Sequence, residues 1–160
     1  MRAFVLVLVV CLTLVVSACG ASPAATGSPA QSAPAASAGP IQIVEPWTRA
    51  SIGGMGGNSA TYLVIRNTGT AADRLVKVDS DVAKAIELHT TEMQGNTMSM
   101  RPVAGGIEVP AGGQVELKPG GYHVMLIGLN RELKPNDRVT FKLQFEKAGA
   151  VDVQATVKQP

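Results

Sequence analysis

The residues with the most distinctive chemistry are two histidines, His89 and His123, and two methionines, Met100 and Met125. Ten residues separate His89 from Met100, and a single residue separates His123 from Met125. A thioether is a neutral, soft donor that binds Zn²⁺, Ca²⁺ and Mg²⁺ poorly and Cu(I) well, while imidazole binds copper in either oxidation state. These four side chains therefore predict a copper(I) site near the surface.

The positions of the cysteines agree with this interpretation. Cys11 and Cys19 both lie in the N-terminal segment, so the rest of the chain offers neither a thiolate nor a disulfide. An oxidising compartment converts cysteine pairs to disulfides but leaves imidazole and thioether donors available. The missing thiolate also argues against a blue-copper electron-transfer site. A neutral donor set suits a carrier that holds copper and then releases it.

The first His–Met pair depends on a predicted hairpin over residues 84–103. If this hairpin closes over Gln94 and Gly95, or over a four-residue turn centred there, His89 lies directly opposite Met100, with Cβ atoms roughly 5 Å apart. On that register Met98 is diagonal to His89 on the same face, which makes it an auxiliary candidate ligand. A three-residue turn would shift the register by one residue and separate the donors.

The second pair follows from strand alternation. In residues 122–126, His123 and Met125 share one face, and Val124 and Leu126 share the other. Residues 86–89 divide in the same way, with Glu87 and His89 on the face away from the apolar positions. We therefore expect the apolar set in the core and both imidazoles on an outer face or a rim.

The remaining candidates have plainer interpretations. Met93 is predicted at the hairpin tip, and Met55 lies in a glycine-rich loop from which it could at most approach a metal. Trp47 is predicted to fill the core near the first strand. A single methionine is usually core filler, and a single strand histidine is usually a surface residue. A β-domain whose histidines and methionines are incidental therefore stays an open alternative.

The N-terminal segment predicts export. A positive start at Arg2 precedes an apolar run, residues 3–16, that is short for a membrane-spanning helix and resembles a signal peptide. The sequence Val-Ser-Ala-Cys at 16–19 resembles a bacterial lipobox, which implies a signal peptide of residues 1–18 and a lipid on Cys19. An uncleaved anchor and a simple secretory signal are the alternatives. We expect a lipid anchor at the outer face of the cytoplasmic membrane, or in the periplasm or outer membrane.

Two further segments follow. Residues 19–40 contain no large apolar side chain and are rich in Ala, Ser, Pro and Gly, a composition that predicts a disordered tether. Residues 41–158 are expected to form one copper-binding β-domain. Strand patterns separated by turn residues recur through it, and about eight short strands predict a Greek-key barrel or sandwich. The expected strands are 41–47, 60–66, 74–78, 84–92, 97–103, 114–118, 122–129, 138–146 and 151–158.

Charge excludes some functions. The chain has 14 Lys and Arg against 12 Asp and Glu, with no run of like charges, so it lacks the electrostatic footprint of a nucleic-acid-binding protein.

There is no nucleophile–base pair, and two histidines are too few for a hydrolytic zinc site. We therefore do not expect an enzyme.

Several motifs resemble the periplasmic copper chaperone family often called PCuAC. They are Glu-Leu-His at 87–89, Met-Ser-Met-Arg-Pro at 98–102, Gly-Gly-Ile-Glu-Val-Pro at 105–110 and Leu-Lys-Pro-Gly-Gly-Tyr-His-Val-Met-Leu at 117–126. Many members have methionine directly after the first histidine, where this chain has Thr90, and the gap between Met100 and His123 is one residue longer than in the common motif. Neither departure removes a ligand.

This resemblance implies a cupredoxin-like barrel that binds one Cu(I) through His89, Met100, His123 and Met125. It also implies delivery of copper to the dinuclear centre of cytochrome c oxidase, with an oxidase subunit or a thioredoxin-like copper chaperone as partner. A copper-storage or detoxification lipoprotein is the alternative in a different class.

Overall fold

The computed structural model describes residues 36–51, 54–95 and 97–159. The predicted signal peptide, Cys19 and most of the predicted tether lie outside the described residues. Within them the chain is built from strands, and no helix there is long and apolar enough to cross a membrane. The strands are β1 (Ala36–Ala38), β2 (Ile41–Arg49), β3 (Ser59–Asn67), β4 (Asp73–Asp79), β5 (Ala83–Gln94), β6 (Thr97–Pro102), β7 (Ile107–Val109), β8 (Gln114–Leu117), β9 (His123–Leu129), β10 (Arg138–Phe145) and β11 (Gly149–Lys158).

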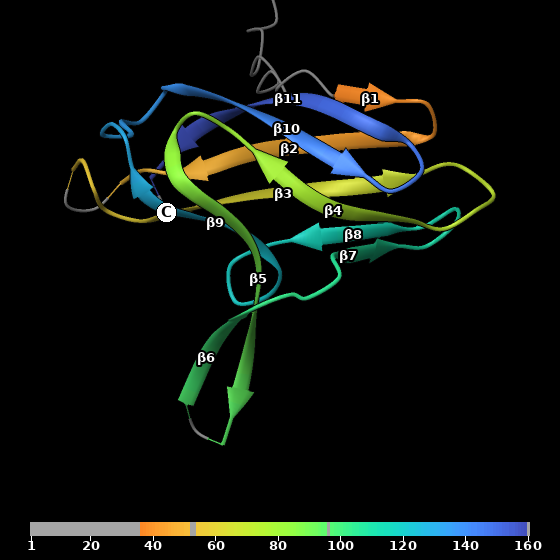
Figure 1. The fold of residues 1–160 in the computed structure, drawn as a ribbon, viewed down its shortest axis with the longest axis horizontal. Helices are drawn as coiled ribbons and strands as arrows, with labels where there is room; N and C mark the ends of the chain where they lie inside the picture. The colour runs from red at the N-terminus through yellow and green to blue at the C-terminus, as the bar shows by residue number, and fades with distance from the viewer. Residues whose placement is uncertain (1–35, 52–53, 96, 160) are drawn as a thin grey trace, which may run out of the picture. The chain divides into compact units, whose positions relative to one another are not determined.

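The strands form one sheet that curls around a core (Figure 1). Its order is β6-β5-β9-β3-β2-β11-β10-β4-β7, with β1 added to β2 and β8 added to β3. The last strands of this order lie against the first ones, because β4 contacts β5, and β7 contacts β3 and β8. Within the described residues every pairing is antiparallel except that of β2 with β11. The β5–β6 hairpin extends away from the curled sheet (Figure 1).

Two short strands were not expected from the sequence. β1 lies inside the segment predicted to be a tether and pairs with β2, so regular structure is already present at Ala36, before the expected domain start at Ile41. Its alanines pack against the core, and pairing with an open strand edge does not require large side chains. β7 pairs with β4 through only three residues, which is too short for a clear alternation pattern.

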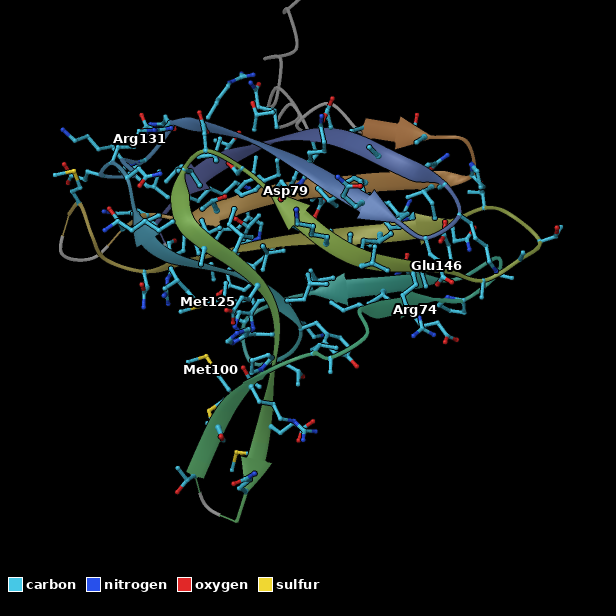
Figure 2. The ribbon with its side chains drawn as sticks, in the orientation of Figure 1. Arg74, Asp79, Met100, Met125, Arg131 and Glu146 are labelled. Atoms are coloured by element: carbon cyan, nitrogen blue, oxygen red, sulfur yellow. The ribbon has the colours of Figure 1, made fainter. Side chains whose placement is uncertain are left out.

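A buried carboxylate joins the start of β4 to the turn between β10 and β11. Asp73 Oδ1 accepts hydrogen bonds from the backbone N–H of Arg74 at 2.7 Å and of Lys147 at 2.9 Å, and Oδ2 accepts one from Ala148 N–H at 2.9 Å. Arg74 extends the link through its ion pair with Glu146, where the two side chains lie side by side (Figure 2). Burial by itself would raise the pKa of Asp73, but the three backbone hydrogen bonds and the charge of Lys147 hold it below its ordinary value.

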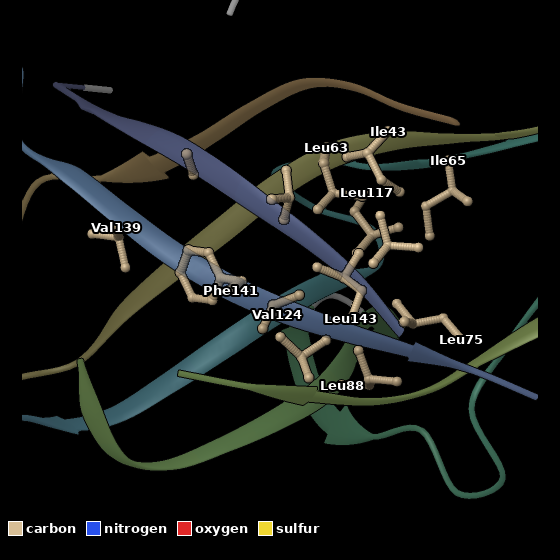
Figure 3. Packing of buried hydrophobic residues seen from close by; sticks show 14 of the residues in the cluster. Ile43, Leu63, Ile65, Leu75, Leu88, Leu117, Val124, Val139, Phe141 and Leu143 are labelled. Carbon is tan, nitrogen blue, oxygen red and sulfur yellow. The ribbon is translucent and has the colours of Figure 1, made fainter. Parts of the chain in front are cut away.

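The core confirms the strand alternation read from the sequence. Leu88 and Val124 face each other across β5 and β9 with 8% and 1% of their surfaces exposed, and Leu126 is fully buried beside them. Ile86 packs at the edge of this cluster. Phe141 fills the middle from β10 (Figure 3). The opposite face of β5 and β9 is therefore left for the polar set that contains the histidines.

The Asp73 contacts predict a pH-dependent contribution to stability. A group whose pKa is lowered by folding stabilises the native state above its unfolded pKa, about 3.9 for Asp, and this contribution is lost as the pH falls below that value. Asp73→Asn should therefore lower the free energy of unfolding by about 1–3 kcal/mol at pH 7 and by much less at pH 3, as measured by urea denaturation. The exposed Asp152→Asn is the control and should change little at either pH. Equal losses for Asp73→Asn at both pH values would contradict this account.

Candidate metal centre

Four rings line up across four neighbouring strands on the outer face of the sheet. Trp47 of β2 is paired with Tyr62 of β3, and His123 of β9 is paired with His89 of β5. The ring centroids are 4.5 Å apart for Trp47 and Tyr62, 6.5 Å for Tyr62 and His123, and 5.8 Å for His123 and His89. The two imidazoles are therefore direct cross-strand neighbours, a contact that the sequence did not reveal.

His123 is held firmly although it lies on the outer face. Only 4% of its surface is exposed, so His123 is more deeply buried than the outer-face or rim position predicted from the sequence. Its Nδ1 lies 3.0 Å from the carbonyl oxygen of Gly121, which also accepts a hydrogen bond from the backbone N–H of Thr91. Because a carbonyl can only accept, Nδ1 carries the proton and Nε2 keeps its lone pair in the neutral ring. A single carbonyl thus fixes the orientation of His123 and ties its loop to β5.

His89 has the opposite arrangement. Its Nε2 lies 2.8 Å from Oε2 of Glu87, two residues earlier on the same face of β5. An ionised carboxylate only accepts hydrogen bonds, so Nε2 is the donor and Nδ1 is left free in the neutral ring. Carboxylate–histidine pairs of this kind orient the ring of a metal ligand and raise its basicity. Alternation had placed Glu87 beside His89, but its role as a support depends on the observed contact.

The thioethers of Met125 and Met100 lie on either side of this pair. Met125 is half-buried opposite Glu87, and Met100 is opposite Thr91 with 59% of its surface exposed. Each methionine is thus a diagonal neighbour of His89, a separation of about 7–8 Å that a long side chain can span. Figure 2 shows Met125 at the body of the sheet and Met100 on the hairpin. His89 is consequently the one member of the four that neighbours the other three.

The predicted hairpin register is wrong by two residues. His89 pairs with Pro102 rather than with Met100, and Met98 pairs with Met93 instead of lying diagonal to His89. The closing pair of the hairpin is Gln94 with Thr97, and Gly95, with φ of 63°, is the first residue of the turn between them, so the turn begins one residue later than expected. A shift of two residues preserves the face of every side chain. Met100 therefore stays on the His89 side, while Met98 moves out of its reach.

Trp47 is not a core residue, contrary to the sequence prediction. Pairing between β2 and β3 is irregular between Val44 and Trp47, where Glu45 has a positive φ of 51°. This bulge shifts the alternation so that Thr48 points inward and Trp47 outward. Trp47 instead packs on Tyr62, whose pKa is raised by burial even though the charge of Arg49 opposes the shift.

The described residues contain no cluster of three or more His, Cys, Asp or Glu side chains placed to hold a metal. The candidate donors at this site are two imidazoles and two thioethers, and none of them carries a charge when the rings are neutral. Met55 is 75% exposed in a loop whose Gly56 hydrogen-bonds to Leu129, at the far end of β9 from His123. The donor chemistry therefore fits a soft monovalent cation.

Comparison with protein families and known sequences gives consistent matches. Residues 41–157 match the family described as "Putative lipoprotein LpqE-like". A relative named "Putative lipoprotein Lxx21020" from Leifsonia xyli is 30% identical over 118 residues, which covers 74% of this chain and 69% of the relative. An uncharacterised protein of Rickettsia prowazekii is 30% identical over 124 residues, covering 75% and 68%.

Solved structures share the fold. The apo PCuAC domain from PmoF1 is 26% identical with a TM-score of 0.66, covering 79% of this chain and 99% of that domain. The copper-bound PCuAC domain from PmoF2 is 28% identical with a TM-score of 0.64, covering 79% and 98%. Cu(I)-bound DR1885 from Deinococcus radiodurans is 29% identical with a TM-score of 0.59, covering 86% and 87%. The expected cupredoxin-like all-β fold is confirmed; of the eleven strands described, nine correspond to the expected ranges, and β1 and β7 are additional.

The two hydrogen bonds predict opposite tautomers for the two rings. Under mildly alkaline conditions, where imidazole is neutral, His89 should carry its proton on Nε2 and His123 on Nδ1. Long-range proton–nitrogen correlation NMR distinguishes these forms directly. Glu87→Ala should change the proton–nitrogen correlations of the His89 ring and leave those of the His123 ring unchanged. An Nε2-protonated His123 in the wild type would show that the Gly121 contact does not set its tautomer.

Proposed function

The chain belongs to the LpqE-like lipoprotein family, and we propose that it is an exported, non-catalytic carrier of one copper(I) ion. The observation that supports this most strongly is the facing pair His89 and His123, whose ring centroids are 5.8 Å apart. The hydrogen bonds leave Nδ1 of His89 and Nε2 of His123 available to a metal. Copper is the cargo in this proposal rather than a resident cofactor. We assign its ligands as His89, His123, Met125 and Met100.

The choice of copper(I) follows from the donors and is supported by the structural relatives. Thioethers select soft, monovalent copper over zinc, calcium or magnesium. One of the similar structures is described as copper-bound and another as CuI-bound, at 28% and 29% identity. Both imidazoles are already oriented by hydrogen bonds, so little reorganisation is needed to present Nδ1 of His89 and Nε2 of His123.

The uneven burial of the ligands suggests how copper is held and released. His123 is 4% exposed and Met125 half-buried, whereas Met100 is 59% exposed on the hairpin. Met100 must swing toward His89 to complete the site, and its flexible, unbranched side chain suits that movement. We infer that an incoming acceptor ligand replaces Met100 first, because this thioether is both the most accessible and the least constrained.

Anchoring and destination complete the proposal. A lipid on Cys19, with the Ala-, Ser-, Pro- and Gly-rich segment that follows it serving as a tether, would hold the domain at the outer face of a membrane and let it reach a membrane-bound acceptor. The resemblance to copper chaperones favours the dinuclear copper centre of cytochrome c oxidase as that acceptor, reached directly or through a thioredoxin-like copper chaperone. A storage lipoprotein would use the same ligands but would retain the metal.

Copper(I) competition tests the ligand assignment. Under reducing, anaerobic conditions the wild type should withdraw one equivalent of Cu(I) from a chromogenic chelator. His123→Ala and Met100→Leu should each weaken binding by at least roughly tenfold, the loss typical of removing even a supporting group at a metal site. Met55→Leu is the matched control, since it removes an exposed thioether far from the site. Wild-type affinity in both site variants would refute the assignment.

Transfer separates a carrier from a store. The copper-loaded protein, mixed with the apo copper domain of an oxidase subunit or with an apo thioredoxin-like chaperone, should lose its single ion to the acceptor, and mass spectrometry of both partners would follow the exchange. Retention of the ion by this chain in the presence of excess acceptor would favour storage. Transfer should be faster than dissociation into buffer, because an acceptor ligand replaces Met100 without complete release of the ion.

A further inference from the structure

Three exposed methionines lie on one face of the hairpin that extends from the sheet. Met93, Met98 and Met100 have 62%, 62% and 59% of their surfaces exposed. Large apolar side chains in water contribute nothing to the core. The site proposed above uses only Met100, and neither Met93 nor Met98 belongs to the buried core.

The register makes these two methionines a pair. Met93 of β5 is directly opposite Met98 of β6. Val103 N–H donates to the Leu88 carbonyl at 2.8 Å, and antiparallel pairs alternate between hydrogen-bonded and non-hydrogen-bonded positions. The Met93–Met98 pair therefore occupies a non-hydrogen-bonded position, where opposed side chains lie closest together.

The side chains on this face of the hairpin carry no carboxylate and no ammonium group. The hairpin's charged pair, Glu92 and Arg101, joins across the other face, as alternation requires. Thr91 and Met100 occupy the next position inward on the methionine face, followed by His89. No carboxylate or ammonium from β6 or from residues 89–94 of β5 therefore lies on this face to compete for, or repel, a cation held by the sulfurs.

The pair also leads toward the inner site. Met98 and Met100 are two residues apart on β6, a step of about 7 Å along a strand. Met98 leans back toward the sheet, since its Cε lies 4.0 Å from the position that a Cβ on Gly120 would occupy. Gly120 belongs to the loop whose next residue, Gly121, orients His123. The thioethers thus form a continuous series from the hairpin tip to the histidines.

We propose that Met93 and Met98 form a second, outer copper(I) site that receives the ion before it passes through Met100 to the inner site. The nature of the ion rests on the proposed function. With two neutral thioethers and no imidazole, the outer site binds more weakly than the inner one. At equilibrium the inner site therefore fills first, and the outer site is too weak to withdraw Cu(I) from the chelator of the competition assay. No electron or proton moves in this step, because one thioether simply replaces another on Cu(I).

NMR of the full chain, labelled with ¹³C at the methionine methyl groups, gives a separate signal for the methyl group bonded to each sulfur. The protein is titrated with Cu(I) under anaerobic reducing conditions. The first equivalent should shift the signals of Met100 and Met125. The second should shift those of Met93 and Met98 together. In Met93→Leu the Met98 shift should disappear and the stoichiometry should fall from two to one, while Met55→Leu should retain both steps.

The outcomes separate the two proposals. If the Met93 and Met98 signals stay fixed through the second equivalent, or if Met98 still shifts in Met93→Leu, the outer site is refuted while the inner assignment stands. If Met93 and Met98 shift within the first equivalent together with Met100 and Met125, they belong to a single site and the outer site is again refuted. If Met100 and Met125 do not respond to the first equivalent, it is the proposed function that fails.

Discussion

The pairing of β5 with β9 is the constraint on which the rest of the site depends. Leu88 and Val124 are opposed on the inner face of this pair, and His89 and His123 occupy the next position on the outer face. A slip of one residue would turn the imidazoles inward and expose the apolar side chains. Each large apolar side chain contributes about 1.5–3 kcal/mol when buried. The core thus fixes the separation of the two rings.

Support for the histidines comes from the body of the sheet, and freedom for Met100 comes from the β5–β6 hairpin that extends from it. Near the sheet, Gly121 and Glu87 orient the two rings, and burial excludes water from His123. Beyond His89, the β5–β6 hairpin extends away from the rest of the sheet (Figure 1), and its methionines are exposed to solvent. A carrier needs this gradient, because retention requires oriented ligands and release requires at least one that can leave.

The family assignment and the donor set are mutually consistent. LpqE-like proteins are described as lipoproteins and the similar solved structures as PCuAC domains. An exported protein cannot rely on free thiols, because an oxidising compartment converts them to disulfides. Imidazole and thioether donors avoid that loss and keep the affinity of the site for soft copper. The proposed copper carrier would therefore suit the compartment that its N-terminal sequence predicts.

The sequence by itself determined the all-β fold, nearly all of the longer strands and the types of donor. It also showed that His123 shares a face with Met125, because side chains alternate with a strict period of two along a strand. It predicted the face of Met100 correctly but not its partner, since the register depends on where the turn at Gly95 begins. Trp47 was misplaced for a similar reason, because a bulge at Glu45 changes the alternation locally.

Only the tertiary structure decided that His89 faces His123. Their strands, β5 and β9, are distant in sequence but are neighbours in the sheet, and no local pattern encodes this long-range pairing. The roles of Glu87 and the Gly121 carbonyl followed from that pairing, because a hydrogen bond depends on distances that only folding sets. The sequence thus determined which atoms could bind a soft metal, and the long-range strand pairing decided that they meet.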